Sequence, residues 1–400
     1  MSPKKYLLNA ILFSLCITSN LNAAPVIIAF TRHTFRGIDK LTPPPAITIS
    51  NLKIQNTILS YGENATHSGL AITKKFAESA YNNGAKLALK TIGEKPDIAG
   101  HWAIIRADLA QERTFSTAVY LYKGLSKNNS PKISLVGCRT SEAVPVDYIS
   151  TGDHNFSKCI APYLSSHKNN SNQSIISEKF IMLANHLITL LGGKPNINAD
   201  NLTIYFSSIK LLSDQIEMSS DLGMPLNAVL EKNTITSPQI NHEAVTTAMQ
   251  LLGYSLFENS SNLEMQALTL LKANYIDSLK GGTQEIIVTH DTKMNALLNN
   301  LGFLTKKSSP NEFSVYPIET ITIAMNEKKV AIVRTRINIR KDGSMTGAAG
   351  FKSWVFWSGP RKQWNAHVAA LREKVNHEKR IAACVQKATL CHAVLLQLKQ

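Results

Sequence analysis

Short apolar runs alternate with helical patterns along this chain, and that alternation limits its fold more than any other feature. Buried strands are predicted over residues 26–31, 102–106, 133–136 and 285–289. Helices are predicted between them, one from the N-cap Thr66 to residue 82 with Gly84 as its stop, and one over residues 111–122. Strands that alternate with helices indicate an α/β fold with parallel strands.

The middle of the chain shows a different pattern. Residues 175–191 and 202–218 carry apolar side chains at helical spacing with no strand between them, and the polar residues 165–174 are predicted to be a surface linker. The strand pattern returns at Gln284, so a helical insertion into one α/β domain explains the order better than two consecutive domains. The predicted boundaries are 25–160 and 270–400 for the α/β core and 161–269 for the insertion.

Three later features have simple structural interpretations. Residues 320–339 alternate well enough to form a hairpin that turns at residues 326–328. Residues 191–195 have Gly followed by Pro, which is typical of a helix end and lacks the spacing of a phosphate loop. The aromatic residues Trp354, Phe356 and Trp357 are predicted to pack in a late strand or loop, with a binding surface as the alternative.

The N-terminus has the pattern of a signal peptide. Lys4 and Lys5 precede an apolar run over residues 6–17 that is too short to span a bilayer, and small residues before Ala24 and Pro25 offer a cleavage site. A membrane anchor is the alternative. No later stretch is long or apolar enough to span, so residues 1–24 are predicted to be removed from a periplasmic or secreted protein with no stable membrane insertion.

Four cysteines remain after the predicted cleavage, Cys138, Cys159, Cys384 and Cys391. An even number in an exported chain favours disulfides. The simplest pairing is local, joining the first to the second and the third to the fourth. Metal binding is the alternative, although the chain has no Cys-x-x-Cys and neither cysteine pair comes with a second pair of ligands.

The formal net charge is +15, and it falls to +13 when Lys4 and Lys5 leave with the signal peptide. This balance suits anionic substrates or surfaces. The basic residues are spread along the chain, however, which is also what a solvated surface requires. No zinc finger, RNA-binding signature or basic-aromatic stripe points to a nucleic-acid partner.

Reactive and charged residues follow three of the predicted strands. They are Arg32, His33 and Arg36 after the first strand, Arg113 at the start of the helix after the second, and His290 and Asp291 after the last. In open α/β sheets, ligands bind beyond the carboxyl ends of the strands. Each short motif alone occurs often as an ordinary structural feature, but their joint occurrence at strand ends predicts one shared site.

The residue types at these ends suit phosphoryl chemistry. Three arginines and a histidine would bind a dianion through planar, bidentate donors. A second histidine can attack phosphorus and form a covalent intermediate. An alkoxide leaving group needs a proton, which Asp291 is placed to donate. This scheme uses no metal or other cofactor, and its substrate is a small phosphomonoester.

The same residues resemble a known family. Arg32-His33-x-x-Arg36, followed much later by His290-Asp291-Thr292, is similar to the signature of the histidine acid phosphatases, above all their periplasmic phytase and glucose-1-phosphatase branch. The resemblance extends to residues 65–69, 112–114 and 223–225 and covers most of the mature chain. The cysteines also fall where that branch has two disulfides.

The resemblance implies a role for each residue. His33 would be the nucleophile, and Asp291 would be the proton donor. The groups that hold the phosphate would be Arg32, Arg36, Arg113 and His290. It also implies a three-layer α/β sandwich core built from both ends of the chain, with an inserted and mostly helical cap domain. The function implied is that of a secreted acid phosphatase that works through a phosphohistidine.

The sequence departs from the family pattern near the nucleophile. Thr34 stands where the family usually has Gly, Ile38 where it has Pro, and Lys293 where it often has Asn. Ser208 lies about where phytase-like members carry a substrate-contacting Glu. These departures weigh against phytase activity more than against phosphatase activity, since the Thr34 side chain narrows the pocket and favours small substrates.

Two alternatives stay open. The first is a narrow specificity, as a glucose-1-phosphatase or a phytase. The second is a non-catalytic secreted protein that keeps the pocket as an anion-binding site, for which the departures at Thr34 and Ile38 are the support. The sequence sets neither the physiological substrate nor the oligomeric state.

Overall fold

The computed structural model describes residues 24–33, 48–49, 52–53, 81–96, 103–107, 112–125, 133–136, 159, 177–221, 238–341 and 350–386 of the 400-residue chain. Its strands are β1 (Val26–Arg32), β2 (Thr48–Ile49), β3 (Leu52–Lys53), β4 (Ala103–Ala107), β5 (Ile133–Val136), β6 (Gln284–Thr289), β7 (Thr320–Met325), β8 (Lys329–Ile337) and β9 (Phe351–Pro360). Its helices are α3 (Glu112–Leu125), α5 (Ser177–Leu190), α6 (Leu202–Asp221), α7 (Pro238–Ser260), α8 (Leu263–Ser278), α9 (Asp291–Asn300), α10 (Pro310–Phe313) and α11 (Arg361–Asn376).

In the described ranges, the main sheet has seven strands in the order β5-β4-β6-β1-β7-β8-β9. On one side of β1, neighbouring strands are parallel, and on the other side they are antiparallel. The four predicted strands are confirmed as β1, β4, β5 and β6, and the predicted hairpin is β7 and β8. The late aromatic segment, predicted as a strand or loop, is the strand β9. β1 therefore joins a parallel half to an antiparallel half.

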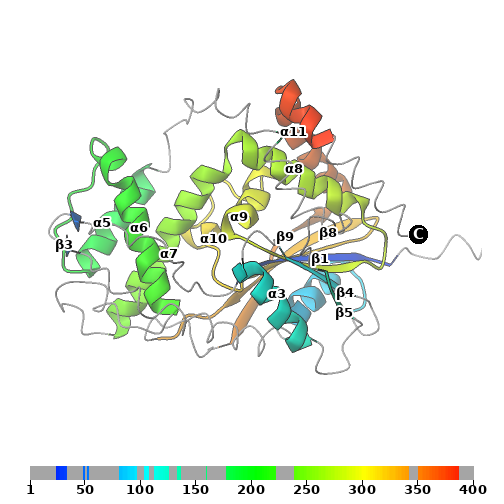
Figure 1. Ribbon diagram of the computed structural model, residues 1–400, viewed down its shortest axis with the longest axis horizontal. Helices are drawn as coiled ribbons and strands as arrows, with labels where there is room; N and C mark the ends of the chain where they lie inside the picture. The colour runs from blue at the N-terminus through cyan, green and yellow to red at the C-terminus, as the bar shows by residue number, and fades with distance from the viewer. Residues whose placement is uncertain are drawn as a thin grey trace, which may run out of the picture.

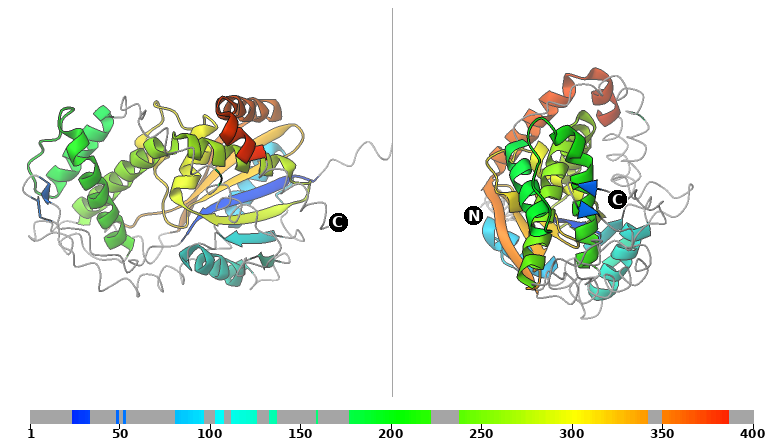
Figure 2. Two further views of the ribbon diagram at one scale, coloured as in Figure 1. Left: turned by 45° about the horizontal axis from the view of Figure 1, so that its top comes forward. Right: turned by 90° about the vertical axis from the view of Figure 1, so that its left-hand side faces the viewer.

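Alternate residues of β1 face two different helical layers. Val26, Ile28 and Phe30 belong to the core that also contains side chains of α8, α9 and α11. Ile27 and Ala29 face the opposite side, where α3 and the helical residues 81–92 pack. This period of two is what a strand buried on both faces requires. Figure 2 shows helices above and below the sheet, so the core has three layers.

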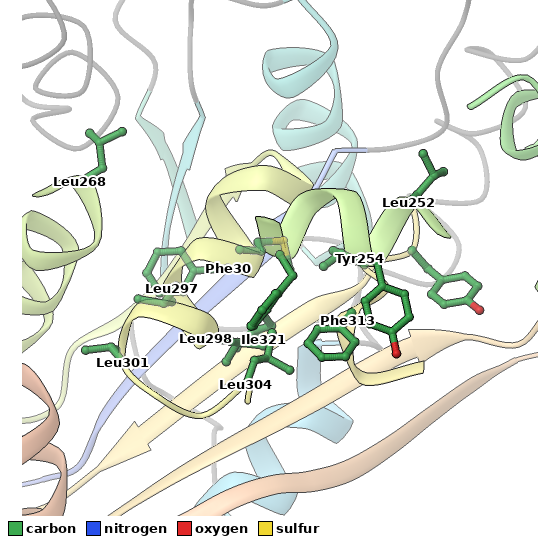
Figure 3. Close-up of a cluster of buried hydrophobic side chains, with 14 of the residues drawn as sticks. Phe30, Leu252, Tyr254, Leu268, Leu297, Leu298, Leu301, Leu304, Phe313 and Ile321 are labelled. Atoms are coloured by element: carbon green, nitrogen blue, oxygen red, sulfur yellow. The ribbon is translucent and has the colours of Figure 1, made fainter. Parts of the chain in front are cut away.

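The helices of the middle of the chain form the second part of the structure. α5, α6 and α7 pack together beside the sheet, to its left in Figure 1, and α7 also contacts α9 and α10. Figure 3 shows where the two parts meet, with Tyr254 of α7 and Phe313 of α10 beside Phe30 of β1 and Leu297 and Leu298 of α9. The fold is an α/β sandwich with a mostly helical insertion between β5 and β6.

The prediction that a helix stops at Gly84 is wrong. The helical residues 81–92 run through this glycine. A Cβ at Gly84 would lie 2.9 Å from Oγ1 of both Thr322 and Thr335. The glycine is therefore explained by close packing of this helix against β7 and β8, and not by a helix end.

The predicted local pairing of the cysteines is also wrong. Cys159 is bonded to Cys384, 225 residues away, with their Cα atoms 6.1 Å apart. The pairing follows from the folded path of the chain, which brings the segment after β5 to the helical residues 381–386, and not from closeness in sequence. Cys138 and Cys391 lie outside the described residues.

Within the part of the chain that the structure describes, none of the helices has the length and apolarity that crossing a bilayer requires.

Candidate active site

The ends of β1 and β6 bring two histidines together. The strands are parallel neighbours in which Arg32 pairs with Thr289, so the residues that follow them emerge at the same edge of the sheet. The backbone N–H of His33 donates to the carbonyl oxygen of Thr289 at 3.0 Å. The rings of His33 and His290 meet edge to face, with their centroids 5.0 Å apart. The structure thus joins two predicted site residues from distant parts of the sequence.

Arg32 is enclosed beside these rings. Its side chain is 1% exposed and lies on the same face of β1 as Phe30. Nη1 donates to Oε1 of Glu217 at 2.6 Å and to the carbonyl oxygen of Val315 at 2.6 Å. Nη2 pairs with Oδ2 of Asp291 at 3.0 Å. One guanidinium therefore connects the end of β1 to α6 of the insertion and to α9 of the core.

Asp291 is the first residue of α9, and His290 alone separates it from β6. Its Oδ1 accepts the backbone N–H of Thr292 at 2.8 Å and the hydroxyl of the same residue at 3.2 Å, which orients the carboxyl group. The side chain of Asp291 is 14% exposed, whereas those of Arg32 and Glu217 are 1% and 2% exposed. Of these three charged groups, Asp291 has the most access to solvent.

The segment before β7 supports the end of β1. The backbone N–H of Arg32 donates to the carbonyl oxygen of Glu319 at 2.9 Å, and that of Ile318 donates to the carbonyl oxygen of His33 at 3.4 Å. Ile318 has φ +52°, a conformation that β-branched residues rarely adopt. Such strain persists only where the surroundings impose it. Here the side chain of Ile318 is buried in the core beside the strand end.

A second ionic cluster holds this segment in place. The carboxylate of Glu319 accepts Nε of Arg334 at 2.6 Å, Nε of Arg336 at 2.7 Å and the backbone N–H of Tyr316 at 2.9 Å. Both arginines also donate to the carbonyl oxygen of Ser314. Burial acts to raise the pKa of Glu319, but the two guanidinium groups outweigh it and hold the pKa below its ordinary value.

The remaining predicted site residues are placed in part. Arg113 is the second residue of α3, a helix that packs on β4 and β6. Arg36 lies outside the described residues, as do Thr34 and Ile38. Lys293 is a half-buried residue of α9. The structure therefore brings together Arg32, His33, His290 and Asp291 of the predicted set.

Sequence reasoning missed Glu217. It follows Ile209, Leu212 and Ile216, which are buried at helical spacing along α6, and it lies on the same stripe. An ionisable residue on the apolar stripe of a helix is unusual, and this pattern could have marked Glu217 as a candidate. The predicted position Ser208 lies nine residues earlier on the same helix and is half-buried.

Similarity to known proteins is found in the fold and not in the sequence. No family model matches the sequence, and no curated protein sequence matches it. Among solved structures, the phytase from Citrobacter braakii superposes with a TM-score of 0.50 and 13% identity, over 86% of this chain and 97% of that one. Phytases of Hafnia alvei (apo form) and Klebsiella sp. ASR1 give TM-scores of 0.49 and 0.47, with 12% and 10% identity. They cover 86% and 92% of this chain, and 96% and 97% of their own. At this identity, the similarity to the Citrobacter braakii structure shows a shared fold.

Proposed function

We propose that this protein hydrolyses phosphate monoesters through a phosphohistidine at His33. The observation that carries the proposal is the meeting of His33, His290 and Asp291 at the ends of two parallel neighbouring strands. Such strand ends are where α/β folds bind ligands. A nucleophile, a second imidazole and a partly exposed carboxyl group are the components that phosphoryl transfer to a side chain needs.

The proposed reaction has two steps. A ring nitrogen of His33 donates its lone pair to phosphorus and forms an N–P bond, while the P–O bond to the leaving group breaks. The leaving oxygen keeps that electron pair and takes the proton of Asp291. A water molecule then attacks phosphorus and gives a proton to the Asp291 carboxylate, and the N–P electrons return to His33 as inorganic phosphate leaves.

Charged groups would stabilise the phosphoryl group during both steps. We assign this role to His290 and to the arginines Arg32, Arg36 and Arg113, whose planar donors match phosphate oxygens. The position of Arg113 at the start of α3 supports the assignment, because this helix follows β4 and packs on β4, β5 and β6. No step in the scheme uses a metal ion.

The direct test is hydrolysis of p-nitrophenyl phosphate at acidic pH by the purified protein. His33→Ala should lower kcat by at least about 1,000-fold, because it removes the nucleophile. His186→Ala is the matched control, since His186 is an exposed residue of α5 that pairs with Glu243. A chelator should leave the rate unchanged. Activity that survives His33→Ala would contradict the mechanism, and activity that a chelator abolishes would contradict its metal independence.

The substrate is the finer part of the proposal. We favour small phosphomonoesters, because Thr34 adds a side chain where the related family usually has glycine. The shared fold with the Citrobacter braakii phytase makes phytate the natural comparison. Rates on an aryl phosphate, glucose 1-phosphate and phytate would separate broad activity from a narrow sugar-phosphate or inositol-phosphate specificity.

We also propose that the protein is exported, with residues 1–24 removed, and that its core comprises residues 25–160 and 270–400 around a cap at 161–269. The bond between Cys159 and Cys384 supports export, since disulfides persist in oxidising compartments. Mass spectrometry of the mature protein should find an N-terminus at Ala24 or Pro25. An intact N-terminal methionine would contradict cleavage.

A further inference from the structure

Glu217 belongs to the helical insertion but contacts Arg32 of the core, in the candidate active site. It lies near the C-terminal end of α6, and its carboxylate pairs with Arg32 at 2.6 Å. The side chain is 2% exposed, and a carboxylate so far from water is unfavourable unless it is paired. The pair therefore fixes the position of the Arg32 guanidinium relative to the insertion.

The guanidinium of Arg32 contacts two carboxyl groups at once, Glu217 through Nη1 and Asp291 through Nη2. A positive charge beside a single carboxyl group favours its ionised form. An ionised Asp291 has no proton to give to a leaving group. The Glu217 carboxylate, on the same guanidinium, offsets that positive charge. When Asp291 is protonated, Arg32 and Glu217 remain as an ion pair with no net charge.

We propose that Glu217 is a positioning residue that acts through Arg32, holding the guanidinium against Asp291 and balancing its charge so that Asp291 can carry the proton for the leaving group. This inference rests on the proposed phosphatase function and deepens it. The helical insertion then takes part in acid catalysis as well as in shaping the site. Glu217 itself touches neither substrate nor the reacting atoms in this scheme.

Other titratable and charged groups lie on the elements that pack against α6 and α9. Tyr316 packs close enough to Glu217 to feel its charge, although burial is the main cause of the raised pKa of this tyrosine. The core side supplies His33, His290, Lys293, Glu319, Arg334 and Arg336. α7 and α8, which pack on α9, supply His242, Glu243, Glu258, Glu264, Lys272 and Asp277. All of these stay the same when Glu217 alone is changed, so a shift in the pH profile reports the loss of its charge.

The test compares two leaving groups. Glu217→Gln keeps the size of the side chain and removes its charge. With an alkyl phosphate such as 2-glycerol phosphate, we expect kcat to fall about tenfold or more, because the poor leaving group needs the proton. With p-nitrophenyl phosphate, whose leaving group needs less help, the fall should be several times smaller. The pH at which activity declines on the alkaline side of the profile should be lower by roughly one unit. KM should change less than kcat.

Two further variants complete the experiment. Glu217→Asp keeps the charge on a shorter side chain, so its leaving-group ratio and pH profile should lie between those of the wild type and Glu217→Gln. Glu243→Gln is the matched control, because Glu243 is a half-exposed glutamate of α7 that pairs with His186. Its kinetics should match the wild type. Circular dichroism and thermal unfolding would report whether each variant folds.

The outcomes separate this inference from the proposed function. Equal losses on both esters with an unchanged pH profile, or no loss at all, would overturn the role of Glu217. If Glu217→Gln does not fold, Glu217→Asp decides by itself, and a uniform loss or none would overturn the role. A wild-type protein with no phosphatase activity, or one indifferent to His33→Ala, would instead contradict the proposed function.

Discussion

Two buried ionic clusters lie side by side at the end of β1, and they have opposite compositions. In the site cluster, one guanidinium, Arg32, holds two carboxyl groups, Glu217 and Asp291. In the support cluster, one carboxylate, Glu319, holds two guanidiniums, Arg334 and Arg336. The first has more carboxyl groups than guanidiniums, and the second has more guanidiniums than carboxylates.

The difference in solvent access separates their roles. Glu319 and Arg334 are fully buried, and both arginines of the support cluster also donate to backbone carbonyls. In the site cluster, Asp291 keeps 14% of its side chain exposed. A closed cluster with its polar groups satisfied fixes a structure, whereas a cluster with one accessible carboxyl group can exchange protons and ligands. The comparison predicts that the support cluster contributes to stability and the site cluster to chemistry.

The largest effect should come from the support cluster. Glu319→Ala leaves two buried guanidiniums without their carboxylate, and we expect the free energy of unfolding to fall by about 3–5 kcal/mol. Denaturant unfolding monitored by circular dichroism measures it. Glu327→Ala, in the exposed turn between β7 and β8, should change stability by no more than about 0.5 kcal/mol. A loss for Glu319→Ala no larger than that for Glu327→Ala would contradict the stabilising role of the support cluster.

The site cluster should show the opposite balance. Asp291→Asn removes the proposed acid, and kcat for an alkyl phosphate should fall by about 100-fold or more. Arg32 keeps its pair with Glu217, so the free energy of unfolding should change by only about 1 kcal/mol. Steady-state kinetics and denaturant unfolding of the same preparation measure both. A variant that is unstable but fully active per folded molecule would assign Asp291 to structure.

Acid should weaken the support cluster selectively. The folded-state pKa of Glu319 is lowered, so its stabilisation is complete above the ordinary glutamate value of about 4.3 and is lost as pH falls through the folded value. The stability difference between the wild type and Glu319→Gln should therefore shrink as the pH drops below about 4. Thermal unfolding of both proteins over a pH series measures it, and a constant difference would contradict the prediction.

The smallest effect should come from an exposed pair of side chains at a similar separation. His186 and Glu243 approach to 2.9 Å, but their side chains are 44% and 49% exposed. Replacing His186 by Ala should change the free energy of unfolding by less than about 0.5 kcal/mol, because water and salt screen the pair. A larger loss would show that distance, and not burial, decides the contribution of these pairs.

The sequence predicted the part of the site that local patterns control. A run of apolar residues followed by Arg32-His33, and another followed by His290-Asp291, were enough to place these residues at the ends of buried strands. The pairing of those strands brought them together, as the parallel α/β pattern implies. The departures from a purely parallel sheet lie in β7, β8 and β9, whose order follows from hairpin connections.

Long-range packing controlled what the sequence did not reveal. Arg334 and Arg336 alternate along β8 as the solvent-facing residues of a strand would, yet they are buried or nearly buried by partners from other segments. Glu217 has its partner 185 residues away. Glycine is common at helix ends, but the glycine at position 84 is explained by close packing against two distant threonines. Each depends on a neighbour that local periodicity cannot identify.

The disulfide has a consequence for how the protein is made. Cys159 emerges from the ribosome 225 residues before Cys384, so the native bond must wait until nearly the whole chain has been synthesised. Cys138 is available much earlier and lies close in sequence, so a premature bond with Cys159 can form first. A catalyst that reshuffles disulfides would correct such a bond, so we expect lower yields of the native protein from hosts or cell-free systems without one.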